Sequence, residues 1–142
     1  MAVESAGEPS RGLQRLKAAA NGANEELTGI CREYGVRLLV AFGSVVRDDP
    51  AANDLDLAAS FVSPDRNVLG LLDELATVAG TSKLDLMDLS SAGPVARERA
   101  LVGGLPLYEQ EPGTFARMQI AAMLERMDTD WLRRLDLELM AR

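Results

Sequence analysis

Two aspartates one residue apart, Asp54 and Asp56, stand at the start of an apolar segment. Side chains at positions i and i+2 of a strand project from the same face, so these carboxylates are expected to lie side by side. Like charges held that close repel, and a cation between them relieves the repulsion. The spacing suits a metal-binding pair, but on these two residues alone a wet strand edge with two solvated acids is the favoured interpretation.

A third acid, Asp85, lies in the alternating segment at residues 82–89, which we predict to be a strand. If that strand neighbours the first, Asp85 joins Asp54 and Asp56 in an oxygen-rich cluster. Such a cluster can hold two divalent ions roughly 3.5–4 Å apart, the arrangement used for phosphoryl and nucleotidyl transfer. Alternation places Asp88 on the opposite face, so we assign it no metal role.

Upstream of the acids, Gly43 and Ser44 follow an apolar run and precede a loop that contains Arg47. Glycine lets the backbone approach a phosphate closely, the serine hydroxyl can donate a hydrogen bond, and arginine adds positive charge. We therefore predict a phosphate-binding turn, distinct from a P-loop because no Gly-Lys-Ser/Thr follows. Alone, Gly-Ser is a weak signal that also fits a simple strand-to-turn glycine.

The composition excludes several kinds of site. The 142 residues contain no histidine and one cysteine, so neither Ser-His-Asp catalysis nor a histidine-based zinc site is possible in this chain. A metal here would need oxygen ligands, which indicates magnesium, manganese or calcium. The formal net charge of -7 argues against direct binding of nucleic acid.

The sequence shows no membrane or secretory signal. No apolar run approaches the roughly 18 residues of a membrane helix, and the N-terminus lacks a basic region followed by an apolar one. We expect a cytoplasmic protein that does not bind membranes. The single Cys31 agrees with a reducing compartment and is predicted to be a buried, unreactive side chain.

The elements that must position these residues form a mixed α/β (α+β) domain, a small mixed sheet flanked by helices. Residues 1–10 are predicted to be disordered and residues 11–142 to form a single domain. Helices are predicted at residues 12–34, with a split or kink at Asn21-Gly22, and at 66–79, 93–102 and 113–141; strands are predicted at 36–42, 54–62, 82–89 and 105–108. Only about ten residues join the first two strands, which favours an antiparallel pair.

The long C-terminal helix at residues 113–141 carries an apolar stripe. Its members are Ile120, Met123, Leu124, Met127, Trp131, Leu135 and Leu139. We predict that the first half of the stripe packs on the protein's own core. Trp131 and the apolar residues beyond it are typical of an adaptable interface, which suggests a hetero-oligomer formed through this helix.

Together, Phe-Gly-Ser, a loop with an arginine, Asp-Leu-Asp-Leu and a later strand aspartate resemble the nucleotidyltransferase superfamily related to DNA polymerase β. The small size is similar to its minimal nucleotidyltransferases, and the terminal helix makes the chain most similar to MntA-type antitoxins, which pair with HEPN-domain toxins of the HepT type. The resemblance covers roughly residues 13 to 140 and implies a nucleotidyltransferase-like fold.

The resemblance also implies roles for the residues above. Gly43 and Ser44 would hold the β and γ phosphates of ATP with Arg47 nearby; Asp54 and Asp56 would bind two magnesium ions, and Asp85 would complete the metal site nearest the acceptor hydroxyl. Antitoxins of this type transfer AMP to a tyrosine of the toxin.

This chain departs from the family pattern in the loop between the phosphate turn and the acids. That loop, residues 45–53, has nine residues, one fewer than in many members. Asp48 follows Arg47 where glycine is frequent, and Asn53 precedes the first acid where serine is frequent. A one-residue deletion in a surface loop is tolerable.

Two other functions stay open on the sequence. The chain could adenylylate a small-molecule alcohol, although relatives of that kind usually carry an added substrate domain. It could also be a non-catalytic antitoxin that neutralises its toxin by contact through the terminal helix.

Overall fold

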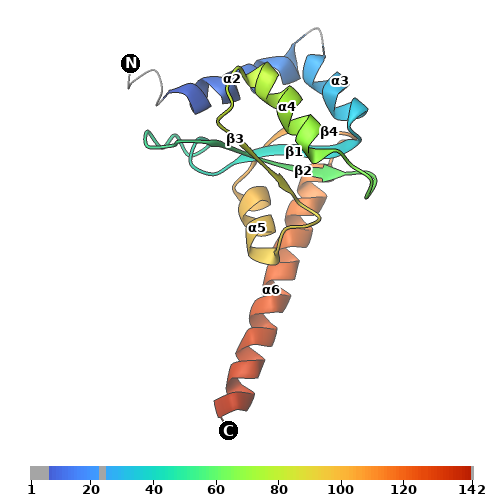
Figure 1. Cartoon of the computed structure of the whole chain (residues 1–142). Coiled ribbons are helices and arrows are strands. Elements are labelled where there is room, and N and C mark those ends of the chain that lie inside the picture. The colour runs from blue at the N-terminus through green and yellow to red at the C-terminus, as the bar shows by residue number, and fades with distance from the viewer. Residues whose placement is uncertain (1–6, 23–24, 142) are drawn as a thin grey trace.

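The apolar segment Val36–Phe42 forms strand β1 inside the sheet of the computed structural model, which describes residues 7–22 and 25–141 (Figure 1). Every residue of β1 except Arg37 is buried, because helices cover both faces of the strand. The other elements are α2 (Glu8–Asn21), α3 (Glu26–Glu33), β2 (Leu55–Phe61), α4 (Val68–Ala79), β3 (Leu84–Asp88), α5 (Pro94–Val102), β4 (Leu105–Glu109) and α6 (Thr114–Ala141). The predicted class, a small mixed sheet flanked by helices with a long C-terminal helix, is confirmed.

The four strands lie in the order β3-β2-β1-β4. β1 pairs antiparallel with β2, as the short connection predicts, and antiparallel with β4 on its other edge. β2 pairs parallel with β3, and α4 supplies the crossover between them. The strand that carries Asp85 is therefore a direct neighbour of the strand that carries Asp56.

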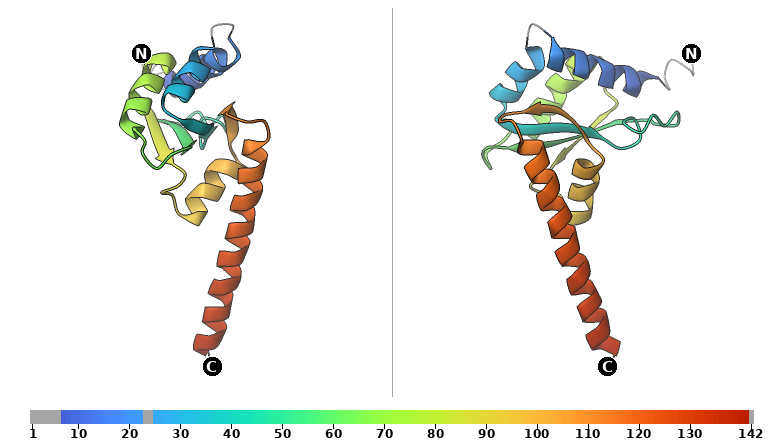
Figure 2. Two further views of the ribbon diagram at one scale, coloured as in Figure 1. Left: turned by 90° about the vertical axis from the view of Figure 1, so that its right-hand side faces the viewer. Right: turned by 180° about the vertical axis from the view of Figure 1, so that it is seen from behind.

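Helices lie on both faces of this sheet (Figure 2), and each face carries a hydrophobic core. Helices α2, α3 and α4 cover one face, with Leu16, Leu27 and Leu75 packed against Leu57 of β2. Helix α5 and the start of α6 cover the other face and bury Leu38, Val40, Phe42, Ala58, Ala100 and Leu101. The second face is the one that Asp56 shares with Ala58, since side chains alternate along a strand.

Cys31 of α3 is fully buried in the first core, as predicted. Burial raises the pKa of its thiol to about 12, which keeps the thiol protonated at neutral pH. The predicted role as a small buried hydrophobe is confirmed.

The N-terminal predictions need one correction. Helix α2 begins at Glu8, so the disorder predicted for residues 1–10 is wrong for Glu8, Pro9 and Ser10; residues 1–6 lie outside the described residues. Pro9 suits the first turn of a helix, and the Glu8 carboxylate accepts a hydrogen bond from the Thr81 hydroxyl at 2.5 Å. These contacts hold the helix start against the domain. The predicted break at Asn21-Gly22 is confirmed, because α2 ends at Asn21 and a separate helix begins at Glu26.

The C-terminal helix packs on the domain through a different face from the predicted one. Phe115, Met118 and Ala122 face α5 and the sheet, whereas Ile120, Met123 and Leu124 are exposed. The prediction that the first half of the apolar stripe packs on the protein's own core is therefore wrong. The small Ala122, only 1% exposed, is buried against the domain, and the Gln119 amide donates to the Leu101 carbonyl at 3.1 Å.

Beyond these contacts α6 projects away from the rest of the molecule, as both views in Figure 2 show. Two ion pairs join α5 to α6 near this point, Arg97 with Glu125 at 2.6 Å and Glu98 with Arg126 at 3.5 Å. Among the described residues, no helix combines the length and the apolar character needed to span a membrane.

Candidate functional site

Asp56 and Asp85 stand directly opposite each other on the parallel pair β2 and β3. Paired residues on neighbouring strands project from the same face of a sheet, so the two carboxylates share one side. Asp54 lies one residue before β2, which begins at Leu55 rather than at Asp54 as predicted. The predicted proximity of Asp85 to Asp56 is confirmed.

The pKa of Asp56 is affected by the neighbouring acids. Burial, followed by the negative charges of Asp85 and Asp54, raises the pKa of the Asp56 carboxyl, and Arg99 and Arg47 oppose the rise. Asp85 and Asp54 are thus close enough to repel the Asp56 carboxylate, and Arg99 and Arg47 are close enough to offset part of that repulsion. A divalent cation bound to these oxygens would relieve the repulsion.

The three acids do not by themselves form a complete metal-binding site. Across residues 7–22 and 25–141, no three acidic or cysteine side chains gather closely enough to hold a metal ion. Asp54 and Asp85 are exposed, and Asp56 is half-buried. The fit to magnesium therefore depends on donor chemistry: carboxylate oxygens on an open edge, with room for water and phosphate oxygens as further ligands.

Gly43 lies against Asp56. Its neighbour Phe42 pairs with Asp56 across β1 and β2, and the chain then turns with Gly43 at φ 82°. A Cβ at this position would collide with Oδ2 of Asp56. The positive φ favours glycine here, and a side chain at this position would have to displace the Asp56 carboxylate.

The loop that follows starts with one helical turn, in which the Arg47 amide donates to the Gly43 carbonyl at 3.2 Å. Val45 and Ala52 are buried in the first core and anchor the loop at both ends. The loop at residues 45–53, one residue shorter than in many family members, is thus packed on the domain. Asp48 adopts φ 58°, a left-handed conformation in which glycine is unstrained and aspartate is tolerated.

Arg99 is the candidate site residue that the sequence analysis missed. It lies on α5 directly before Ala100 and Leu101, which are buried against the face of Phe42 and Ala58. Behind it, Gly104 lies so close to the Ala100 carbonyl that a Cβ would clash, and the same Cβ would be in ordinary contact with the Ala41 carbonyl. These contacts bring the end of α5 to the Gly43 end of β1. No motif includes Arg99, so only the packing of α5 reveals it.

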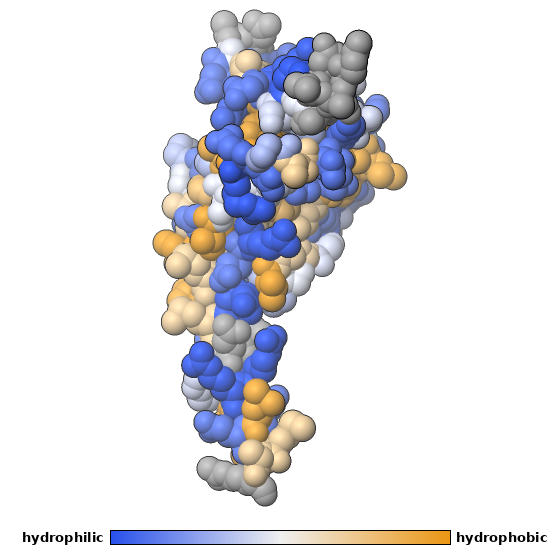
Figure 3. Space-filling model, turned by 90° about the vertical axis from the view of Figure 1, so that its left-hand side faces the viewer, coloured by the Kyte–Doolittle hydropathy of each residue, from blue (hydrophilic) through white to orange (hydrophobic). Residues whose placement is uncertain are grey.

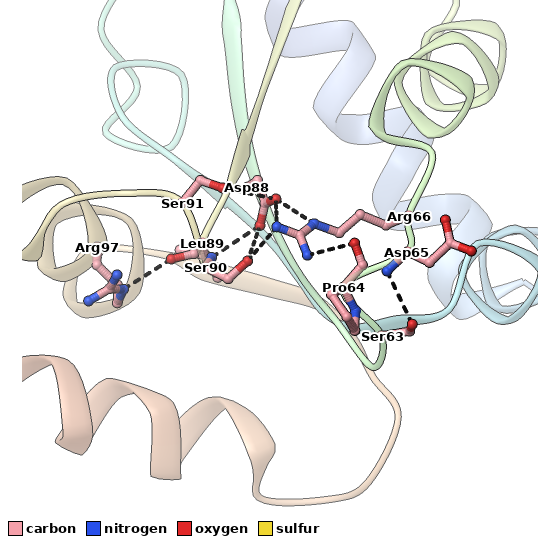
Figure 4. Close-up of polar contacts among 9 residues, drawn as sticks. All are labelled: Ser63, Pro64, Asp65, Arg66, Asp88, Leu89, Ser90, Ser91 and Arg97. Atoms are coloured by element: carbon pink, nitrogen blue, oxygen red, sulfur yellow. Dashed lines mark hydrogen bonds and ion pairs between the residues drawn. The ribbon is translucent and has the colours of Figure 1, made fainter.

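Asp88 occupies the opposite face of the sheet, as alternation predicts, since it pairs with Ala59 of the first core. Figure 4 shows its carboxylate held by Arg66 and by Ser90 and Ser91. Arg66 donates from Nε to Asp88 at 2.6 Å and from Nη2 to the Ser90 hydroxyl at 2.8 Å, and it lies 5.7 Å from the centre of the Phe61 ring. This acid ties the end of β3 to the β2–α4 connection.

Replacement of Arg66 by alanine is expected to lower the free energy of unfolding by about 1–3 kcal/mol, because hydrogen bonds to charged, half-buried groups contribute that much. Burial pushes the pKa of Asp88 upward, but hydrogen bonds from Ser90 and Arg66 outweigh it and lower the pKa. The ionised Asp88 carboxylate therefore stabilises the fold at pH values above its unfolded pKa near 3.9. This stabilisation is lost as the pH falls through the lower pKa that Asp88 has in the folded protein. Urea unfolding at pH 7 and pH 3 measures it.

The control for this prediction is Arg133→Ala on the exposed part of α6, which should leave the unfolding free energy at pH 7 unchanged within ~0.5 kcal/mol. Equal stability of Arg66→Ala and the unaltered chain at pH 7 would show that the network of Figure 4 does not stabilise the fold.

Comparison with known proteins identifies a related family. The family model described as polymerase beta, nucleotidyltransferase matches residues 25–113, which include both acid-bearing strands and the Gly43 turn. A search of curated proteins gave no significant match.

Several solved structures share the fold at low sequence identity. A crystal structure of a toxin-antitoxin with AMP-PNP is 18% identical with a TM-score of 0.64, covering 85% of this chain and 100% of the other. The toxin-antitoxin MntA-HepT is 17% identical with a TM-score of 0.59, covering 83% and 96%. A tri-AMPylated Shewanella oneidensis HEPN toxin in complex with MNT antitoxin is 18% identical with a TM-score of 0.59, covering 83% and 95%.

Proposed function

The chain belongs to the polymerase beta nucleotidyltransferase family, and from that premise we propose that it transfers AMP from ATP to a hydroxyl group of a HEPN-type toxin and so acts as the antitoxin. The observation that carries the proposal is the pairing of Asp56 with Asp85 beside the Gly43 turn. This arrangement combines a carboxylate cluster with a close backbone approach, which are the two requirements for handling a metal-bound triphosphate.

In this proposal the chain's residues divide into two groups. Asp54, Asp56 and Asp85 would supply carboxylate oxygens to magnesium, which when bound would supply the positive charge that phosphate oxygens need. Gly43 and Ser44 bind the β and γ phosphates through the turn. Arg47, with Arg99 from α5, adds positive charge toward the same point, a placement supported by the effect of both arginines on Asp56.

The reaction is a displacement at the α-phosphorus. The acceptor oxygen forms a bond to that phosphorus, and the bond to the pyrophosphate oxygen breaks, so that AMP-protein and diphosphate are the products. The chain contains no histidine, so the acceptor's proton passes to a site carboxylate or to water. The open position of Asp85 suits an acceptor as large as a protein, because the acid is exposed.

The structural neighbours support the choice of acceptor. One of them contains a tri-AMPylated HEPN toxin with its MNT antitoxin, and another contains AMP-PNP. We propose a tyrosine hydroxyl of the cognate toxin as the acceptor and ATP as the donor. Because the proposed donor is ATP, we propose that the reaction takes place in the cytoplasm.

The proposal is tested by incubating the full chain with ATP labelled at the α-phosphate, magnesium and the HEPN protein encoded beside it. We expect label on the HEPN protein and release of diphosphate, both abolished by EDTA. Mass spectrometry should assign the added AMP to a tyrosine.

Two outcomes would contradict this assignment. Label that appears only on a small-molecule alcohol would indicate a different acceptor class. Full neutralisation of the toxin in cells by the Asp54→Asn/Asp56→Asn double variant would show that contact, rather than AMP transfer, silences it.

A further inference from the structure

An unbroken apolar row follows the exposed part of α6 at every fourth residue. Its members, with exposed fractions, are Met123 (47%), Met127 (67%), Trp131 (62%), Leu135 (37%) and Leu139 (58%). We call this row the Trp131 ridge. Figure 3 shows apolar side chains on the projecting part of the molecule, interleaved with polar ones.

The Trp131 ridge points away from the protein's own domain. At 3.6 residues per turn, Trp131 is rotated by about 180° from Ala122, the most buried residue of α6. The helix packs on α5, β1 and β4 through its first turns, and Arg97–Glu125 and Arg126–Glu98 are ion pairs between α5 and α6. No element among residues 7–22 and 25–141 covers the ridge.

The ridge exposes enough apolar surface for a stable interface. Large apolar side chains present on the order of 200 Å² each when free, and the ridge is flanked by Ile120, Leu124 and Leu132, which are each more than half exposed. Together these side chains approach the ~800 Å² per partner that stable interfaces bury. An isolated helix in water is also marginally stable, so a packed partner would stabilise this part of α6.

The pattern of the ridge selects a second copy of the chain as the partner. A two-fold axis through Trp131 pairs Met127 with Leu135 of the other copy and Met123 with Leu139, so each apolar side chain of the ridge meets an apolar one. Self-complementarity of this kind is what an isologous dimer requires. Rows spaced by four residues also pack well against each other, at a crossing angle of about -50°.

We propose that two copies of this chain associate through an antiparallel crossing of their α6 helices, centred on Trp131. The proposal is independent of the nucleotidyl transfer reaction. The centre of the ridge at Trp131 lies beyond Glu125 and Arg126, which pair with α5, so the dimer forms without rearrangement of either domain. The site acids lie on β2 and β3, outside the contact, and both sites stay open.

The register is tested by disulfide formation in the full chain. Met127→Cys mixed with Leu135→Cys should form a mixed disulfide under mild oxidation, because the axis brings these positions together. Either variant alone should form little, since a residue four positions from the axis lies ~12 Å from its own counterpart, too far for a disulfide. Cys31 does not interfere, because it is fully buried.

The association itself is tested by sedimentation equilibrium without toxin. The unaltered chain should be dimeric at micromolar concentration, and Trp131→Glu should raise the dissociation constant at least ~100-fold, since aromatic residues at the centre dominate interfaces. The matched control is Leu137→Glu, an equally exposed leucine off the ridge, which should leave the constant within ~3-fold. Circular dichroism checks that each variant keeps its helix.

A monomeric chain at ~100 μM would overturn the proposal, since stable interfaces of this area associate at far lower concentrations. If Leu137→Glu and Trp131→Glu weakened the association equally, the proposal would also be overturned, because the ridge would then not be the contact surface. So would a toxin complex in which the HEPN protein buries Trp131 while the chain alone is a monomer.

Discussion

Asp56→Asn is expected to lower the rate of AMP transfer to the HEPN protein by at least ~1,000-fold, because it removes the carboxylate that stands opposite Asp85 and against Gly43. Asparagine is close to aspartate in size but carries no charge to hold magnesium or to compensate a triphosphate. Initial rates with labelled ATP, at saturating magnesium, measure the loss. The control is the exposed Asp65→Asn, which should transfer AMP at the unaltered rate.

The same substitution should not destabilise the metal-free protein. Burial and the charges of Asp85 and Asp54 raise the pKa of Asp56, so ionisation of this group opposes folding. Its favourable contribution is present below the unfolded pKa near 3.9 and is lost as pH rises through the raised folded value. At pH 7 without metal, we therefore expect Asp56→Asn to melt no lower than the unaltered chain.

These two results separate a chemical role from a structural one. If the Asp56→Asn variant transferred AMP within ~10-fold of the unaltered rate, Asp56 would not be one of the metal ligands. A variant that is inactive and also melts several degrees lower would indicate that the carboxylate mainly supports the fold.

Gly43→Ala is expected to have the second large effect, on both stability and activity. The residue has φ 82°, and a Cβ would collide with Oδ2 of Asp56. Left-handed strain at a non-glycine residue costs about 1–3 kcal/mol. Displacement of Asp56 or of the phosphate turn by an ångström should lower AMP transfer by ~100-fold. Urea unfolding and initial rates measure the two effects.

Gly93→Ala is the matched control for this prediction. Gly93 caps the start of α5 at φ -73°, and a Cβ there meets nothing within 4 Å, so neither strain nor collision follows. The Gly93→Ala variant should keep an unfolding free energy and a rate of AMP transfer close to those of the unaltered chain. Similar losses in the two alanine variants would show that the contact between Gly43 and Asp56 is not the cause.

The sequence by itself determined the local arrangement of the candidate site. Alternation along a strand follows from covalent geometry, so it correctly put Asp56 and Asp88 on opposite faces. The short connection between the first two strands correctly predicted their antiparallel pairing. The break at Asn21-Gly22 was likewise visible in local residue preferences.

Only the tertiary structure decided the contacts between distant segments. The register that sets Asp56 opposite Asp85 depends on the α4 crossover, and Arg99 approaches the acids because α5 packs on β1. The buried face of α6 was mispredicted because both of its faces carry apolar residues, and period alone cannot tell which one meets a domain. Local geometry decides which way a side chain points, whereas the packing of whole elements decides what it meets.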